Sequence, residues 1–164
     1  MPLGRQLAMV QVNVTSLTHL TGLLLPGMIE RRHGGILNVA STAAFQPGPG
    51  MSVYYATKAY VLSFSEALAE ELTGTGITVT AVCPGPTATN FGAAANMNTL
   101  GLVKRVSMSA EAVARQGHRA FRQGSAVAVT GFRNQVPAFL VRLFPRTIVR
   151  KITRRLNNVK TTPR

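Results

Sequence analysis

Apolar residues recur at helical spacing over about residues 3–32, with polar residues between them, which predicts a long amphipathic helix. We expect Pro26 to kink this helix, because proline lacks the N–H that an interior turn requires. A short run of branched apolar residues at 36–40 predicts a strand buried on both faces of a sheet. A second helix is predicted at 53–72, and a second buried strand at 77–83.

The pattern after the second strand is less regular. Residues 91–108 are small and weakly polar, with several alanines and methionines, which predicts a lid over a binding site. Ser109 begins a helix predicted to reach about residue 122, because a serine hydroxyl can accept a hydrogen bond from a free N–H of the first turn. A third strand is predicted at 126–130 and a last helix at 146–156.

The predicted order alternates helices and strands, which indicates parallel strands joined by crossover helices. The fold class is therefore α/β, with an open parallel sheet covered by helices. Ligands bind such sheets at the carboxyl ends of the strands. Ser41 and the Pro84-Gly85 turn each follow a predicted strand directly, so we expect them to line the ligand site.

Composition agrees with one folded domain. Of 164 residues, 46% are hydrophobic and 14% charged, so the chain can bury a core and is not disordered. The single cysteine, Cys83, excludes an intramolecular disulfide and a cysteine-based zinc site, and we expect no metal centre. No secretory signal opens the sequence, and its most apolar stretch, 20–29, is shorter than the roughly 20 residues of a membrane span. These features predict a cytoplasmic protein without a transmembrane helix.

The formal net charge of +13 is unevenly distributed. Residues 1–100 hold four basic and four acidic residues, whereas the last 64 residues hold fourteen basic residues and one acid, Glu111. The predicted strands all lie within residues 1–131, and we treat residues 132–164 as a basic amphipathic tail.

The tail has two interpretations. On the predicted helix at 146–156, apolar residues occupy one arc and basic residues the other, which is typical of a helix on an anionic membrane surface. A helix docked on its own domain or on a partner subunit, with the basic residues in water, has the same pattern. No nucleic-acid-binding module accompanies the charge, so we expect no nucleic-acid partner.

Tyr54 and Lys58 are four residues apart near the start of the second helix, so they share one face. A phenol with a pKa of about 10 is a poor acid at neutral pH, and a nearby ammonium lowers that pKa by favouring the phenolate. The pair is a candidate proton donor with its tuning group. Alternatively, it is a half-buried tyrosine and a solvated lysine, because this spacing is common on amphipathic helices.

Further motifs accompany this pair. Asn13 lies in Val-Asn-Val within the first helix, Ser41 ends Asn-Val-Ala-Ser, Tyr-Tyr-Ala-Thr-Lys occupies 54–58, and Pro-Gly-Pro-Thr-Ala-Thr occupies 84–89. With these motifs in this order, residues 5–91 resemble the short-chain dehydrogenase/reductase family, and the resemblance continues more loosely to about residue 131. The resemblance implies that residues 1–131 are a partial catalytic domain with a three-layer Rossmann-type parallel sheet.

The resemblance implies catalytic roles for four residues. Tyr54 would exchange a proton with the substrate oxygen, and Ser41 would hold that oxygen. Lys58 would lower the pKa of Tyr54 and hydrogen-bond the nicotinamide ribose, while Asn13 would hold a water in a proton relay. Besides Tyr54 and Lys58, the cofactor contacts would come from Pro84, Gly85, Thr87 and Thr89. Phe91, at the start of the lid, would contact the substrate.

The sequence departs from the family pattern at its start. A complete member begins with a strand, a Gly-rich turn and a helix that together hold the pyrophosphate, and this sequence has no such segment. We expect an N-terminally truncated reading of a longer enzyme; the alternative is a genuine half-domain. On either interpretation we expect an exposed sheet edge, a tendency to aggregate and weak dinucleotide binding.

The functional expectation is an NAD(P)-dependent oxidoreductase that transfers a hydride between the nicotinamide cofactor and a carbonyl or alcohol substrate. The alternative is a catalytically silent remnant or a membrane-associated interaction module. The sequence does not distinguish NADP from NAD, because the residue that reads the ribose would lie in the absent segment. By resemblance we expect a homo-oligomer for the full-length protein, in the cytoplasm or at the membrane periphery.

Overall fold

The computed structural model describes residues 1–89 and 107–157. The elements in chain order are α1 (Leu3–Val10), η1 (Gln11–Ser16), α2 (Leu17–Glu30), β1 (Gly34–Val39), η2 (Thr42–Phe45), α3 (Ser52–Glu71), β2 (Ile77–Cys83), β3 (Thr87–Ala88), β4 (Met108–Ser109), α6 (Ala110–Arg122), β5 (Val127–Val129), α7 (Phe132–Leu140) and α8 (Arg146–Leu156).

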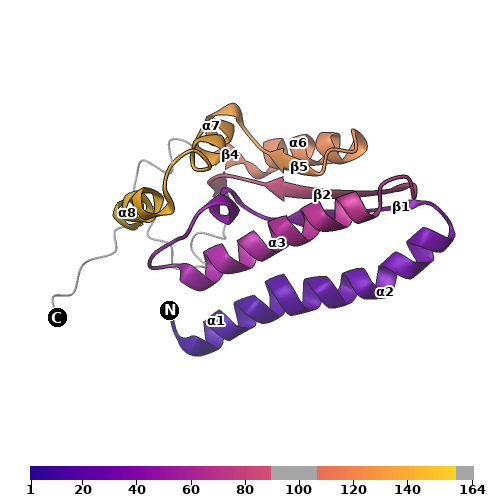
Figure 1. Ribbon diagram of the computed structural model, residues 1–164, viewed down its shortest axis with the longest axis horizontal. Coiled ribbons are helices and arrows are strands. Elements are labelled where there is room, and N and C mark those ends of the chain that lie inside the picture. The colour runs from indigo at the N-terminus through magenta and orange to yellow at the C-terminus, as the bar shows by residue number, and fades with distance from the viewer. Residues whose placement is uncertain (90–106, 158–164) are drawn as a thin grey trace.

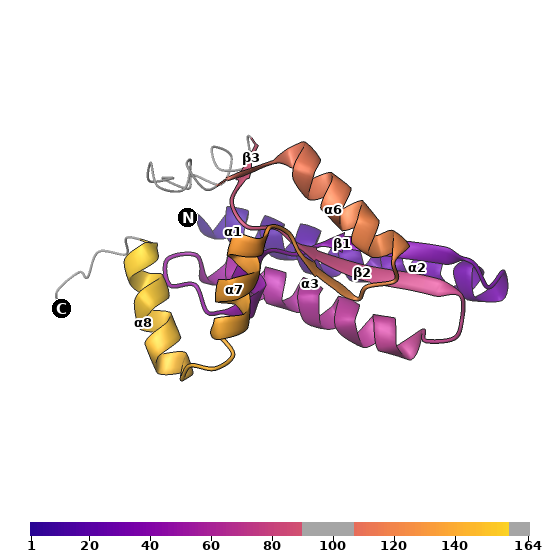
Figure 2. The ribbon, with the colours of Figure 1, turned by 90° about the horizontal axis from the view of Figure 1, so that it is seen from above.

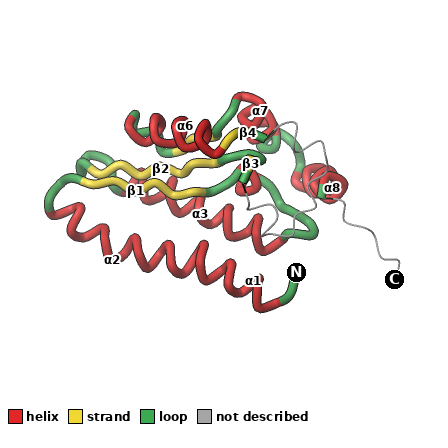
Figure 3. Tube along the Cα trace, turned by 180° about the vertical axis from the view of Figure 1, so that it is seen from behind, coloured by secondary structure: helices red, strands yellow, loops and turns green. Residues whose placement is uncertain are grey.

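Three strands form a parallel sheet in the order β1-β2-β5. The β1–β2 register runs from Gly34 opposite Ile77 to Val39 opposite Val82, and β5 pairs with the end of β2. Helices α1, α2 and α3 cover one face of the sheet and α6 covers the other (Figures 1 and 3). The predicted α/β fold with three layers and a parallel sheet is confirmed.

The core lies between α3 and the sheet. Its best-buried residues are Val61 and Leu62 of α3, Val79, Ala81 and Cys83 of β2, and Ala40 after β1. One polar pair is included, because Asn38 Nδ2 donates to Ser65 Oγ over 2.9 Å at a buried position. This bond attaches β1 to α3 without leaving either polar group unsatisfied.

Burial on both faces is confirmed for β2 but is wrong for β1. Asn38 of β1 faces α3 and is buried, whereas Val39 beside it is 57% exposed, and Leu37 is also exposed. Within the described residues, β1 pairs with β2 alone, so its other edge and one face are open. The apolar strand β1 alternates in burial because α3 packs on the face that carries Asn38, whereas no described residue covers Leu37 and Val39 on the other face.

The first helix forms over nearly the predicted range, 3–32. It continues from α1 through the π-helical turn η1 into α2, passing Pro26 and ending at Glu30. This helical run of 28 residues, Leu3–Glu30, is long and apolar enough to cross a membrane. We expected no membrane-spanning helix, because the most apolar stretch of the sequence, 20–29, is only about ten residues long. Length and composition alone do not separate a membrane span from a helix that packs in an assembly.

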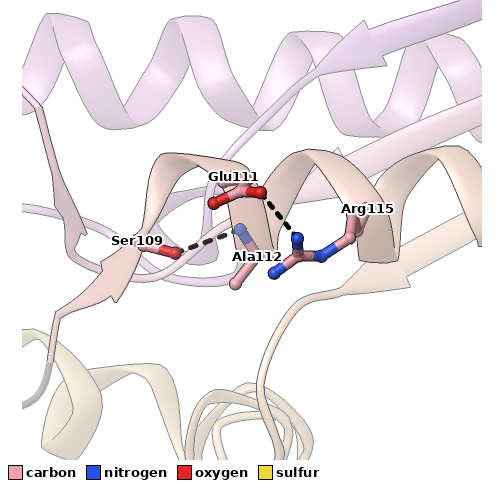
Figure 4. Close-up of polar contacts among 4 residues, drawn as sticks. All are labelled: Ser109, Glu111, Ala112 and Arg115. Carbon is pink, nitrogen blue, oxygen red and sulfur yellow. Dashed lines mark hydrogen bonds and ion pairs between the residues drawn. The ribbon is translucent and has the colours of Figure 1, made fainter.

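The helix at α6 begins as predicted. Ser109 Oγ accepts a hydrogen bond from Ala112 N over 3.1 Å, and Glu111 pairs with Arg115 one turn later at 2.7 Å (Figure 4). Met108, the last residue of the predicted lid, belongs to β4, which pairs with β3. The rest of the predicted lid, 91–106, lies outside the described residues.

The C-terminal part contains one helix that we did not predict, α7, which includes Pro137. The last helix, α8, forms as predicted and docks on the domain through Val149 and Thr153, both buried. Figure 2 shows α7 and α8 following one another towards the end of the molecule at which the strands of the sheet terminate. Of the two interpretations of the tail, a helix docked on its own domain therefore describes the face of α8 that carries Val149 and Thr153.

Candidate active site

Two strand ends meet at the candidate site. Ser41 follows β1 and Pro84 follows β2, and the parallel register brings the two turns together. Thr42 N donates to the Pro84 carbonyl over 2.9 Å, and Ser41 Oγ donates to the same oxygen over 3.4 Å. The predicted convergence of Ser41 with the Pro84-Gly85 turn is present in this structure.

Tyr54 reaches this point from the first turn of α3. Its pKa lies above the ordinary value of 10.0, chiefly because burial disfavours the phenolate; a hydrogen bond with the Ser41 side chain opposes the shift, and Tyr55 adds to it. We expected Lys58 to lower this pKa, and the net direction in this structure is the opposite one. The phenol is therefore held in its protonated form beside the Ser41 hydroxyl.

Lys58 lies one turn after Tyr54 on α3 and points to the end of β1. Its Nζ donates to the Val39 carbonyl over 2.7 Å. Burial lowers the pKa of Lys58, and the Cys83 thiol partly offsets that shift. The ammonium is thus fixed at the carboxyl end of β1, within the same site as Tyr54 and Ser41.

Asn13 is connected to the site through Thr57, a residue that we did not predict. Asn13 lies in the π-helical turn η1, and its Nδ2 donates to Thr57 Oγ1 over 3.1 Å. Thr57 Oγ1 in turn donates to the Tyr54 carbonyl over 2.9 Å, and Thr57 is buried. A signal for Thr57 was present, since it is a hydroxyl on the core side of the Tyr54 helix.

The turn after β2 carries the predicted cofactor residues. Thr87 Oγ1 donates to the Gly85 carbonyl over 3.0 Å, and Thr89 is exposed just beyond β3. A Cβ on Gly85 would come within 2.3 Å of Asn134 Oδ1, and Asn134 Nδ2 is held by the Thr130 carbonyl at 2.7 Å. Asn134 comes from the unpredicted α7, so no sequence pattern pointed to it.

Tyr55, next to Tyr54, does not join the site. Its hydroxyl donates to Asn157 Oδ1 over 3.4 Å, beside a cavity of about 900 Å³ between α3 and the α7–α8 segment. Phe91 lies outside the described residues, so the structure does not place the predicted substrate contact.

The comparison with protein families decides the assignment of the chain. The model described as short chain dehydrogenase matches residues 5–100, more than half of the sequence. The chain belongs to the short-chain dehydrogenase family. In this family the convergence of Ser41, Tyr54 and Lys58 at the strand ends is the arrangement that the resemblance led us to expect.

Curated relatives and solved structures agree with the family. The chain is 47% identical over 77 residues to the NADP-dependent 3-hydroxy acid dehydrogenase YdfG of Escherichia coli K12, covering 47% of this chain and 31% of the relative. It is 43% identical over 83 residues to the very-long-chain 3-oxoacyl-CoA reductase of Bos taurus, covering 51% and 27%. A short-chain dehydrogenase from Sphingobium yanoikuyae, solved with NADPH, superposes with a TM-score of 0.70 at 29% identity, covering 94% of this chain and 57% of that one. The chain spans less than a third of the length of these two curated relatives.

Proposed function

We propose that this chain carries the proton-transfer part of an NAD(P)-dependent oxidoreductase that acts on a carbonyl or alcohol substrate. The observation that carries the proposal is the meeting of the Ser41 and Tyr54 hydroxyls with the Lys58 ammonium at the carboxyl end of β1. Proton donors placed where negative charge develops on a substrate oxygen stabilise the transition state of carbonyl reduction.

Each residue has a separate task in this proposal. Tyr54, held protonated by burial, donates its hydroxyl proton to the carbonyl oxygen. Ser41 hydrogen-bonds the same oxygen and thereby orients the substrate. Lys58, anchored on the Val39 carbonyl, places positive charge beside the phenolate that forms when the proton leaves. Asn13 acts through Thr57, which fixes the carbonyl of Tyr54 and so the position of its helical turn.

The residues after β2 fit the nicotinamide end of a dinucleotide, since the half-buried Pro84-Gly85 turn and the hydroxyls of Thr87 and Thr89 lie at the strand ends. Lys58 would add a charged donor for a ribose hydroxyl. The nicotinamide supplies the hydride when bound. Either NADP or NAD meets these contacts; the name of the Escherichia coli relative and the NADPH in the Sphingobium structure favour NADP.

A pyrophosphate-binding half would complete the site. The open edge of β1 and the exposed Val39 beside it are the features that such a half would cover. The alternative proposal, a catalytically silent remnant or interaction module, requires that nothing covers them. We also propose a homo-oligomer for the complete protein, supported by the exposed apolar residues of α1 and α2, among them Leu3, Leu7, Leu23 and Leu24.

The test compares two polypeptides, this chain alone and the same residues preceded by a Gly-rich dinucleotide-binding half. We expect the chain alone to show no saturable binding of NADPH or NADH in the micromolar range, and the longer polypeptide to bind the cofactor and reduce carbonyl substrates. Saturable binding by the chain alone contradicts the proposed half-site. A longer polypeptide that binds cofactor and reduces no member of a broad carbonyl panel supports the silent remnant.

A further inference from the structure

One stripe of α7 is apolar and exposed. Ala138 is the buried residue of this helix, whereas Phe132, Val136 and Phe139 fall within an arc of about 60° on another side. Phe132 is 77% exposed and Phe139 62% exposed, and Leu143, which follows the helix, is 64% exposed. A domain that leaves so much apolar surface in one segment has a binding partner for it.

The same character continues on α8. This helix docks through Val149 and Thr153, but Ile148, Ile152 and Leu156 form a separate stripe at four-residue spacing that stays exposed. Docking of α8 on its own domain therefore uses a neighbouring face and leaves its most apolar stripe open.

The segment that carries this apolar surface is strongly basic. Between 132 and 156 the sequence has seven basic residues and no acid: Arg133, Arg142, Arg146, Arg150, Lys151, Arg154 and Arg155. Arg142, Arg146 and Arg150 line the cavity against α3, and Arg142 lies over the Phe45 ring at 5.6 Å. Lys151 and Arg155 are exposed and lie beside the open stripe of α8 on the helix surface. The open stripe of α8 therefore has exposed positive charge next to it.

We propose that the exposed face of α7, the following Leu143 and the open stripe of α8 together dock on an anionic lipid surface. We name this set of residues the α7–α8 surface. Aromatic and aliphatic side chains enter the boundary between headgroups and acyl chains, while arginines and lysines pair with anionic headgroups. A second copy of the chain is a poorer occupant, because two such surfaces would bring like charges together.

The test is co-sedimentation of the full 164-residue chain with vesicles of phosphatidylcholine alone and of phosphatidylcholine with phosphatidylglycerol. We expect binding to the anionic vesicles, little binding to the neutral ones, and weakening as salt rises. Lys151→Glu with Arg155→Glu should lower the affinity at least tenfold, since each charge near the surface contributes about fivefold. Phe132→Ser with Phe139→Ser should lower it to a similar extent.

Matched controls keep the test specific to this surface. Leu37→Ser replaces an exposed apolar residue of β1, and Arg119→Glu with Arg122→Glu reverses exposed charges of α6. Circular dichroism checks that each variant is folded. Equal loss in the controls, equal binding to neutral vesicles, or no vesicle binding would overturn the proposal. So would a dimer in solution that Phe132→Ser with Phe139→Ser dissociates, because the surface would then be a contact between copies.

Discussion

Asn13 and Thr57 are 44 residues apart in the sequence, and the Asn13 amide donates to the Thr57 hydroxyl over 3.1 Å. The bond joins the π-helical turn of the first helix to the helix that carries Tyr54 and Lys58. Since Thr57 also donates to the Tyr54 carbonyl, one side chain connects the first helix to the backbone of the proton donor. The π-helical turn contains Asn13 and lies where the first helix makes this hydrogen bond to α3.

Removal of the Asn13 amide should destabilise the domain. Asn13→Ala leaves the buried Thr57 hydroxyl with fewer partners, and we expect the free energy of unfolding in urea to fall by about 0.5–1.5 kcal/mol. Gln11→Ala, an exposed position in the same turn, should change it by less than about 0.5 kcal/mol. Equal effects of the two substitutions would show that the bond contributes nothing.

Tyr54 should be essential for turnover and dispensable for cofactor binding. In the polypeptide that includes a dinucleotide-binding half, Tyr54→Phe removes the proton donor and should lower kcat by about 10²–10⁴-fold. Cofactor affinity should change little. Tyr55→Phe is the control, since the Tyr55 hydroxyl contacts Asn157 and not Ser41. Turnover that survives in Tyr54→Phe would refute the assigned role.

A side chain at position 85 should destabilise the domain, because Asn134 of α7 lies against Gly85. Gly85→Ala places a Cβ against the Asn134 side chain and should break the bond from Asn134 to the Thr130 carbonyl, at a cost of about 1 kcal/mol in unfolding free energy. In an Asn134→Ala background the same substitution should cost clearly less. Additive effects in this double-mutant cycle would mean that the two residues do not collide.

Cys83 should make the domain sensitive to alkali. Burial raises the pKa of this thiol from 9.0 to about 12. The folded state therefore holds the proton more tightly than the unfolded chain, so the contribution of Cys83 to stability is full below pH 9 and is lost as the pH rises towards 12. Between pH 9 and about 11, the unsubstituted chain should lose about 2–3 kcal/mol more unfolding free energy than Cys83→Ala. Parallel pH profiles for the two proteins would contradict this.

The docked face of α8 can be tested by two adjacent substitutions. Val149→Ala removes buried methyl groups and should lower the free energy of unfolding by about 1–2 kcal/mol, whereas Ile148→Ala, at an exposed position, should lower it by less than about 0.5 kcal/mol. Thermal denaturation of both variants measures the difference. A larger loss in Ile148→Ala would show that the helix docks by its other face.

The sequence by itself determined the elements whose signals are local. The branched run 77–83 became β2, the helix ending before Gly74 became α3, and Ser109 capped α6, because strand propensity, periodicity and capping act within a few residues. The motif order also predicted that Ser41, Tyr54 and Lys58 would meet. That prediction rested on the family resemblance. The strand pattern by itself predicted only that Ser41 would lie near the Pro84-Gly85 turn, because parallel strands place their carboxyl ends at one edge of the sheet.

Tertiary structure decided what depends on partners far away in the sequence. Four features follow from packing between distant segments. They are the exposure of Val39, the Asn13–Thr57 hydrogen bond, the position of Asn134 beside Gly85 and the raised pKa of Tyr54. The face by which α8 docks is another case, since Val149 and Ile148 are equally apolar in sequence. Burial and hydrogen bonding are properties of the assembled layers, and no local pattern specifies which side of an element another segment will cover.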